Sequence, residues 1–533
     1  MIGYWEWACR VDRVAPDVTW RDGVRAVPGL RRCKAWRPWR VPEFVTKQEN
    51  ATAAWASIKD VAACAAGVDA QVRAVLRGVM AQRRSARTAF DYVCALAPGV
   101  RANCWDLAEA AGHEGWHRMQ ALLGTYRWDW KELRAQLPAL AAAWLPDRDG
   151  DLTGPGIAID ETAQLKNGDA TACVAPQHAG CTGKVENCVT TVFSAYVTRA
   201  GQAWADFDIY MPRRWAQDLP RRRAARIPAD LELTTKPQLA IGQLRRLKAA
   251  GMPAAWAAAD EVYGRSSSFR QACQQCGLAY VVIIPCDYLI TTAAGTAVRA
   301  DHAAADAVFE RRSCGAGTKG PRVSDWAMIA TGRPRELLLI RRLLSRPDQL
   351  TYYLCWAPED RPATMTYFIT IAGRRWPAEE TVKTGKDTLG WDQSQARTWD
   401  AACRHTALAA LAQLRHAAIR NALCGGITLA APDDGPGPAH GQDEDVDDAD
   451  LLIPLGDAPV PARGGQPCPP SIPPIRLSIA ETARLTQLAG QALAGLITRA
   501  RLAFALRWSA RRRRHQAAAR WHHHSARLIA AAT

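Results

Sequence analysis

The sequence predicts an α/β protein with a mixed sheet core, a helical region before the sheet, a strand-rich insertion, and an acidic linker followed by a basic tail. Between residues 156 and 284, short apolar runs alternate with amphipathic helical segments, as expected for strands and helices of one α/β core. Before residue 150 the apolar period is helical. Residues 431–474 are rich in Pro, Gly and Asp, a composition that cannot bury a core of its own.

Length and charge set limits on what the chain can be. It has 533 residues and a formal net charge of +16, supplied mostly by arginine, so we expect a large catalytic domain with flanking modules and a polyanionic partner. Codon usage in a GC-rich genome is an equally good explanation of the arginine content. The 16 cysteines show no disulfide framework, and neither a signal peptide nor a membrane-spanning run is evident. These features predict a cytoplasmic protein.

The residues before the core fall into two parts. Residues 1–45 form an irregular segment rich in Trp and Arg, either a DNA-contacting arm or upstream sequence translated from an over-extended start. Residues 46–150 are predicted to be helical and to bind DNA ends. Within them, 103–123 resembles a helix-turn-helix whose second helix would offer Arg118, with His117 and Gln120, to a groove. An ordinary helical hairpin explains this pattern too.

The core is predicted in two parts that flank an insertion. The first part, 151–287, has apolar strand-like runs and helical segments; the strands are expected at 156–160, 189–197, 203–210, 254–259 and 278–284, and the helices at 236–250 and 267–276. Residues 288–372 are predicted to be a strand-rich insertion, with strands at 326–330, 336–341 and 350–356. Residues 373–430 are predicted to close the core with helices, beginning near Pro377.

The end of the chain changes charge abruptly. Residues 431–474 form the predicted disordered acidic linker, and residues 475–533 a basic helical tail that includes Arg511 to Arg514. Glu481 is the only acid after Pro474. The linker could screen the tail until DNA displaces it, or the tail could simply be solvated.

Two cysteines have the spacing of a metal motif. Cys273 and Cys276 form a CxxC, but no second pair or Cys/His cluster lies nearby in sequence to complete a tetrahedral zinc site. A buried helical face is the better interpretation of this pair.

Two aspartates follow apolar strands. Asp160 and Asp260 each end a predicted strand, where open α/β sheets generally place their ligands. Either residue alone would usually be a helix cap or a turn residue. The pair becomes informative only if a third acid can join it.

A third acid lies on the helix predicted to begin at Pro377. At about 100° per residue, Glu379 and Lys386 are some 20° apart around the axis, and Arg375 projects to the same side. Glu380 points about 100° away and is better placed to be solvated or to support the site from outside. An ordinary helix with alternating charges would show the same pattern.

Several segments, taken together and in order, resemble the DDE transposases of bacterial insertion sequences, in the branch with a Tyr-Arg-Glu-Lys signature around the third acid. The resemblance runs from about residue 50 to 430, and it departs from the signature at Ala372, where the tyrosine would fall. The segments that carry it are Ile157 to Gly168, Gly183 to Cys188, Asp260 to Gly264, Arg375-Trp376 with Glu379-Glu380, and Lys319 to Arg322 with Asp325-Trp326.

The resemblance implies an RNase H-like core in which Asp160, Asp260 and Glu379 bind two Mg²⁺ ions, or Mn²⁺ in their place. It implies that Arg375 and Lys386 contact phosphates of the transposon end. Further candidates for DNA contact are Lys166, Lys184, Lys319, Arg322 and Arg118. The implied partner is double-stranded DNA, both element ends and target, bound by a homodimer.

Two other functions remain open from the sequence. The chain could be a domesticated or inactive DNA-binding protein that has kept the fold, a hypothesis favoured by the missing tyrosine. It could also be an RNase H-like nuclease acting on RNA or repair intermediates, although the insertion and the basic tail are unnecessary for such an enzyme. The presence of all three acids favours an active transposase.

Overall fold

The computed structural model describes residues 47–147, 152–317, 320–424 and 477–532. Apart from Lys47, these residues belong to one compact unit, residues 48–533. The predicted irregular segment 1–45, the predicted linker 431–474 and Lys319 lie outside the described residues.

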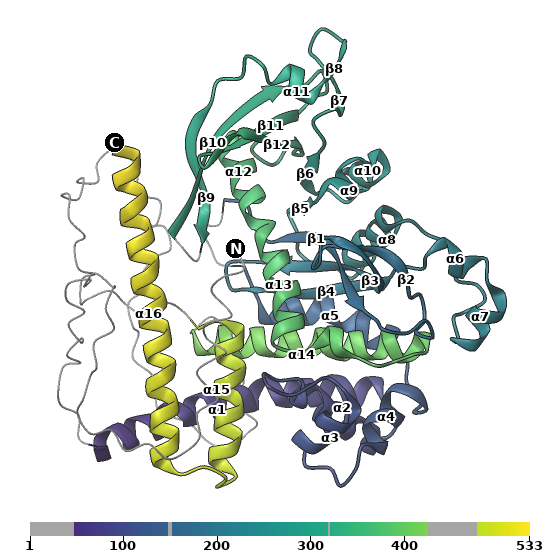
Figure 1. Cartoon of the computed structure of the whole chain (residues 1–533), viewed down its shortest axis with the longest axis vertical. Coiled ribbons are helices and arrows are strands. Elements are labelled where there is room, and N and C mark those ends of the chain that lie inside the picture. The colour runs from purple at the N-terminus through teal and green to yellow at the C-terminus, as the bar shows by residue number, and fades with distance from the viewer. Residues whose placement is uncertain (1–46, 148–151, 318–319, 425–476, 533) are drawn as a thin grey trace, which may run out of the picture. The chain divides into compact units, whose positions relative to one another are not determined.

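Five strands form the centre of a mixed sheet (Figure 1). They are β1 (Gly156–Leu165), β3 (Lys184–Val197), β4 (Gln202–Ile209), β5 (Trp256–Ala259) and β6 (Ala279–Ile284). Their order is β4-β3-β1-β5-β6; β3 is antiparallel to both β4 and β1, whereas β5 and β6 are parallel to β1. This is the RNase H-like arrangement, so the predicted α/β fold is confirmed.

The sheet extends beyond this centre on both sides. The short β2 (Ala175–Ala179) pairs with β3. On the other side β12 pairs antiparallel with β6 and leads outward through β11, β10 and β9. The bounds of these strands are Arg346–Trp356 (β12), Glu336–Leu343 (β11), Gly320–Ala330 (β10) and Glu310–Gly317 (β9). The three strands predicted in the insertion therefore exist, but they continue the core sheet.

The smaller elements of this region are a hairpin and a short helix. The hairpin pairs β7 (Leu289–Thr291) with β8 (Ala297–Arg299) as a separate two-stranded sheet, and α11 (Ala300–Ala303) follows it.

The predicted strand-rich region ends earlier than expected. Residues Met365–Arg374 form helix α12, although strand-rich structure was expected as far as 372. Thr364 caps this helix by accepting a hydrogen bond from the Tyr367 backbone N–H. Tyr367, Phe368 and Ile371 are buried at helical spacing. Arg375 then joins α12 to α13 (Trp376–Asp387), so the predicted helix near Pro377 is present.

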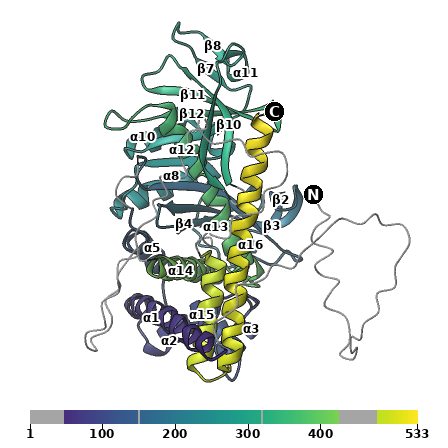
Figure 2. The same ribbon diagram turned by 90° about the vertical axis from the view of Figure 1, so that its left-hand side faces the viewer.

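Helices surround the sheet (Figures 1 and 2). Those that follow β4 and β5 are α6 (Arg213–Ala216), α7 (Leu219–Ala224), α8 (Lys236–Ala249), α9 (Glu261–Gly264) and α10 (Ser267–Gln275). After α13 come a 3₁₀ turn, η1 (Trp391–Gln393), and α14 (Trp399–Leu423), which is buried along most of its length. In both views α14 lies between the helices of residues 47–124 and the sheet.

The region before the sheet is helical, as predicted. Its helices are α1 (Lys47–Val79), α2 (Arg83–Ala95), α3 (Cys104–Ala110), α4 (His117–Gly124) and α5 (Trp130–Trp144). Leu133 of α5, Phe207 of β4 and Leu411 of α14 belong to one hydrophobic cluster. These helices therefore share the core of the sheet instead of forming a separate module.

The carboxyl-terminal residues form two helices, α15 (Ile479–Leu493) and α16 (Arg499–Ala532). α15 packs against α14, and α16 reaches β10. Cys273 is buried on α10 and Cys276 caps that helix, so the CxxC belongs to a packed helix end. In the part of the chain that the structure describes, no helix combines the length and apolar character needed to span a bilayer.

Candidate metal centre

Asp160 and Asp260 lie at the same level on two adjacent strands, where their parallel pairing stops. The parallel ladder of β1 and β5 ends with Ile159 opposite Ala259, so each aspartate is the next residue beyond it. β1 itself continues to Leu165, paired with β3, so the expectation that this strand ends at Asp160 is wrong. Carboxylate oxygens of Asp160, Asp260 and Glu161 lie within 4.8 Å of one another. The end of the parallel ladder thus brings Asp260 close to Asp160 and Glu161, which are about 100 residues earlier in the sequence.

The crowding of these acids changes their protonation. Burial raises the pKa of Asp160 to about 7, against the opposing influence of Arg375 and with a further contribution from Asp260. Burial also raises the pKa of Asp260 to about 6, and Glu161 adds to the shift. A cation placed among these oxygens would relieve the repulsion, and hard oxygen donors of this kind are what Mg²⁺ prefers.

Asp260 is held by the short helix that follows it. Its Oδ1 accepts a hydrogen bond from the Val262 backbone N–H at 3.0 Å, which makes it the N-cap of α9. Gly264 lets α9 approach β6 closely, because a Cβ there would lie 1.8 Å from the Ile283 carbonyl oxygen. A larger residue at 264 would push α9, and Asp260 with it, away from the sheet.

Glu161 is a member of this group that the sequence did not indicate. Its carboxylate accepts hydrogen bonds from Lys236 Nζ at 2.7 Å and from the Tyr263 hydroxyl at 2.6 Å. Successive strand residues normally point to opposite faces, so its closeness to Asp160 was not expected. In the sequence, the only indication that Glu161 could belong to the site was its position next to Asp160.

Arg375 connects the first and third predicted acids. Its guanidinium contacts Glu379 Oε1 at 2.6 Å and Asp160 Oδ2 at 3.7 Å. Since a guanidinium group is compact and planar, these two carboxylates are separated by no more than about 9 Å. Glu379 lies outside the group of three acids within 4.8 Å. The structure thus brings Glu379 to the edge of the centre, with Arg375 between.

Helix α13 is seated firmly against the sheet. Lys386 Nζ donates to the Ala163 carbonyl of β1 at 2.8 Å, and Gln413 Nε2 donates to the Thr381 carbonyl at 2.8 Å. A Cβ on Gly385 would lie 2.1 Å from the Trp204 ring, so only glycine permits this approach. Glu380 points away from the acids, as predicted, and accepts from Gln202 Nε2 at 3.2 Å.

The other predicted DNA-contacting cations have varied surroundings. Lys166 donates to the Ser394 carbonyl at 2.5 Å, and burial lowers its pKa to about 8. Arg322 donates to the Gly373 carbonyl at 2.7 Å, beside the junction of α12 and α13. Lys184 is exposed at the start of β3, and Arg118 is exposed on α4. Their role in DNA binding stays a prediction.

A second pair of acids lies on β4. Asp206 and Asp208 contact Arg134 at 3.6 and 2.9 Å and Arg246 at 2.8 and 2.5 Å. Two arginines therefore balance two aspartates. Burial raises the pKa of Asp206 to about 6, but Arg246 opposes that shift.

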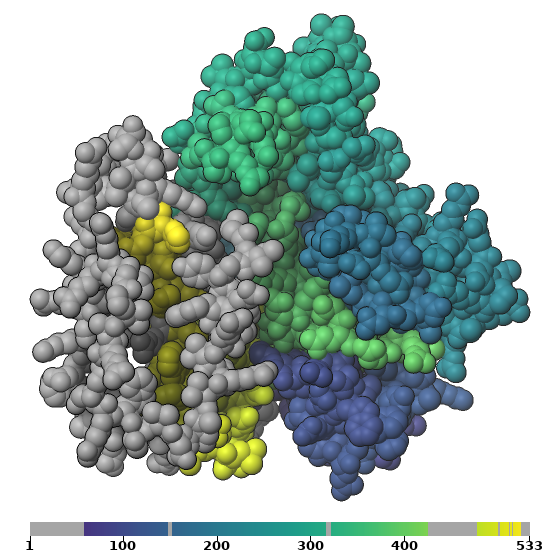
Figure 3. Space-filling view, in the orientation of Figure 1, coloured from purple at the N-terminus to yellow at the C-terminus, as the bar shows by residue number. Residues whose placement is uncertain are grey.

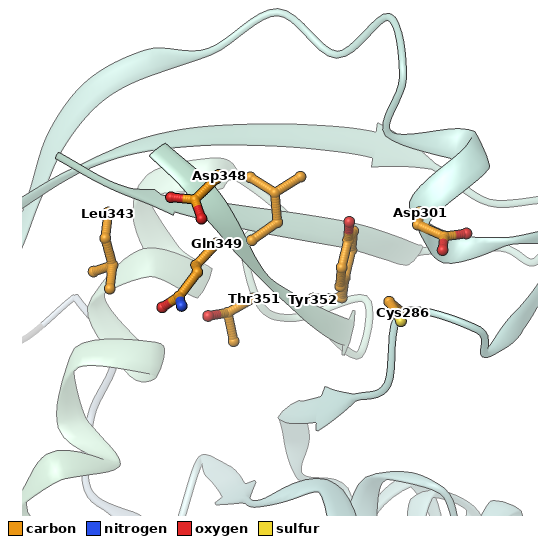
Figure 4. A pocket seen from close by; sticks show the side chains of 8 residues that line it. Cys286, Asp301, Leu343, Asp348, Gln349, Thr351 and Tyr352 are labelled. Atoms are coloured by element: carbon orange, nitrogen blue, oxygen red, sulfur yellow. The ribbon is translucent and has the colours of Figure 1, made fainter. Parts of the chain in front are cut away.

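An open polar pocket lies in the strand-rich region (Figure 4). Its lining comes from the residues after β6, from α11, and from β11 and β12, and includes Cys286, Asp301, Asp348 and Tyr352. None of the predicted site residues lines it. In the space-filling view, the green segment that contains α13 is visible between the teal strand-rich region and the blue β1–β4 region (Figure 3).

The strand order and the acidic group together define an RNase H-like fold with three carboxylates that could hold a metal ion. Residues 74–305 match the family model described as DDE superfamily endonuclease. This range includes all three clustered acids and ends before Glu379. Over these residues the chain is similar to DDE superfamily endonucleases, and this match confirms the DDE resemblance drawn from its motifs.

A curated relative agrees with this assignment. The chain is 27% identical over 187 residues to the probable transposase for insertion sequence element IS701 of Microchaete diplosiphon. The match covers 35% of this chain and 45% of that protein, so it spans less than half the length of the relative.

Proposed function

We propose that the chain is a DNA transposase that cleaves the ends of an insertion sequence and joins them to target DNA. The observation that carries the proposal is the convergence of Asp160, Asp260 and Glu161 within 4.8 Å where the β1–β5 ladder ends. The DDE endonuclease match and the similarity to the IS701 transposase support it.

The proposed cofactor is a pair of Mg²⁺ ions, with Mn²⁺ as a substitute. The donors fit such ions because they are carboxylate oxygens. The three clustered acids also carry negative charge that no cation of their own group neutralises. Asp160, Asp260 and Glu379 would hold the metal. Bound ions would activate the attacking oxygen and stabilise the leaving oxygen of a phosphodiester.

The neighbouring cations position the DNA in this proposal. Arg375 is paired with Glu379 and Asp160, and a metal ion at these acids would release its guanidinium for a phosphate. Lys386 on the same helix holds α13 to β1 and lies within the segment that carries Glu379. Arg375 is thus the proposed phosphate-binding group, and Lys386 the group that fixes the third acid.

The proposal has two further components. The partner is double-stranded DNA, both the inverted repeats of the element and its target. The working form is a homodimer, because two ends must be held together for coordinated excision. Light scattering of the protein with and without end DNA measures the second component.

The test is metal-dependent cleavage of duplex DNA that carries the inverted repeats flanking the gene. Asp160→Asn and Asp260→Asn are expected to lower cleavage by more than about 1,000-fold while end binding persists. Asp287→Asn, at an exposed acid in the turn after β6, is the matched control and should cleave normally.

The alternative, a domesticated DNA-binding protein, predicts a different result. It requires the unaltered chain to bind the inverted repeats without cutting them in Mg²⁺ or Mn²⁺. Cleavage that survives both aspartate substitutions would remove the proposed role of the acidic group.

A further inference from the structure

The carboxyl-terminal helices are fixed to the body of the protein by an apolar cluster. Ile58 and Val61 of α1 pack with Leu485 and Ala489 of α15 and Leu502 of α16, and all five are buried. α15 also packs on α14. The basic tail predicted from the sequence is therefore a docked helical hairpin over its described residues.

Glu481 links the two helices of this hairpin by an ion pair. Its carboxylate contacts Arg512 at 2.7 Å and Arg484 at 3.0 Å, and its side chain is almost fully buried. Burial opposes ionisation, but hydrogen bonds from Arg512 and Ser509 outweigh it and lower the pKa of Glu481. Since Glu481 is the only acid after Pro474, the single negative charge of this region is used internally.

The outer face of α16 combines cations with aromatic rings. At about 100° per residue, Arg501, Phe504, Arg507, Trp508, Arg512 and His515 fall within about 140° of the helix circumference. All six are exposed, including Phe504 at 56% and Trp508 at 43%. The opposite side buries Leu502 and Ser509.

The helix also leads towards the metal centre. α16 contacts β10, and Figures 1 and 2 both show it extending from α15 to that strand. β10 carries Arg322, which donates to the Gly373 carbonyl beside Arg375. A ligand bound along α16 would therefore approach the segment that connects α12 to α13.

We infer that the exposed face of α16 is a second contact surface for duplex DNA, separate from the metal centre, with Arg501 and Arg507 binding phosphates. This inference rests on the proposed function for its choice of partner. A helix of 34 residues without one acid complements a polyanion along about 50 Å. A basic helix with exposed aromatics could instead bind an anionic membrane surface, and the DDE domain on the same chain favours DNA.

The experiment measures how DNA affinity depends on salt in the full-length protein. Fluorescence anisotropy with a labelled duplex of about 30 base pairs, in EDTA and between about 50 and 200 mM salt, gives the slope of log K against log salt. Arg501→Gln/Arg507→Gln should make the slope shallower by about 2, because each phosphate contact contributes about 0.9.

The matched control removes the same charge elsewhere. Arg213→Gln/Arg214→Gln changes two exposed arginines of α6 and should leave the slope within about 0.5 of the unaltered value. Both double variants should keep the thermal melting temperature, because all four arginines are exposed.

Three outcomes would overturn the inference. The slope could be unchanged in Arg501→Gln/Arg507→Gln, or it could fall equally in the α6 control, which would indicate a general charge effect. The α16 variant could instead lose binding to phosphatidylserine vesicles while DNA binding stays intact. Because EDTA prevents cleavage, the binding measurement does not depend on the proposed function. A chain that shows the predicted slopes but does not cut the inverted repeats in Mg²⁺ or Mn²⁺ would refute the proposed function and leave this inference standing.

Discussion

Two clusters of acids on one sheet have opposite electrostatic designs. On β4, Asp206 and Asp208 face two arginines, Arg134 and Arg246, so the charges balance within the fold. Where the β1–β5 ladder ends, Asp160, Glu161 and Asp260, with Glu379 nearby, form ion pairs among the described residues with Arg375 and Lys236 alone.

The difference separates structural acids from acids available to a ligand. A buried charge pair with good geometry satisfies itself, and its loss is costly because one charge remains unpaired. Four carboxylates with two cations leave an excess of negative charge, which a metal ion can neutralise. Raised pKa values alone do not separate the clusters, because Asp206 and Asp260 are each raised to about 6.

The largest expected effect on stability comes from the balanced cluster. Arg134→Met should lower the free energy of unfolding by about 3 kcal/mol, because Asp206 and Asp208 lose a shared partner in a buried setting. Arg375→Met should lower it by less than about 1 kcal/mol, since Asp160 can take up a proton instead. Urea unfolding of the metal-free variants measures both. Equal losses of unfolding free energy in the two variants would show that both clusters contribute equally to stability.

The third metal ligand can be assigned by a pair of isosteric changes. Glu379→Gln should lower Mg²⁺-dependent cleavage by about 100-fold or more, because an amide replaces a carboxylate ligand. Glu161→Gln should lower it by less than about 10-fold, since an amide oxygen can still accept from Lys236 and Tyr263. A larger loss in Glu161→Gln would transfer the ligand role from Glu379 to Glu161.

A smaller effect concerns stability and pH. Burial raises the pKa of Asp160 from its ordinary value of 3.8 to about 7 in the folded protein. At a pH between these two values, the native state therefore keeps a proton that the unfolded chain has lost. Stability contributed by this group is therefore present at low pH and declines as pH rises towards 7.

Asp160→Asn should consequently stabilise the metal-free protein by about 1 to 3 kcal/mol at a pH of about 8. The gain should be close to zero at a pH of about 4, where both states are protonated. Thermal or urea unfolding in EDTA measures it, with Asp287→Asn as the control. Destabilisation at the higher pH would mean that the ionised carboxylate is well accommodated without metal.

The sequence predicted the parts of this molecule that follow from local pattern. Asp160 and Asp260 could be paired because apolar strands precede both and parallel strands end at the same sheet edge. The face of α13 that carries Glu379 and Arg375 followed from helical geometry, and their ion pair confirms that the two side chains meet.

What the sequence did not predict depends on long-range packing. No local pattern shows that β12 pairs with β6, which makes the insertion part of the core sheet. Nor does it show that Arg322 would hold the Gly373 carbonyl or that Lys386 would hold Ala163. The contribution of Glu161 was missed because strand alternation places it on the other face, whereas the side chains of Asp160 and Glu161 converge.

The most direct test of the account is the location of a bound metal. Crystals of the protein grown with Mn²⁺ should give an anomalous peak among the carboxylates of Asp160 and Asp260, at about 2.0 to 2.2 Å from their oxygens, and none at Asp206 and Asp208. No peak at the β1 and β5 ends, or an equal peak in a protein carrying both Asp160→Asn and Asp260→Asn, would contradict it.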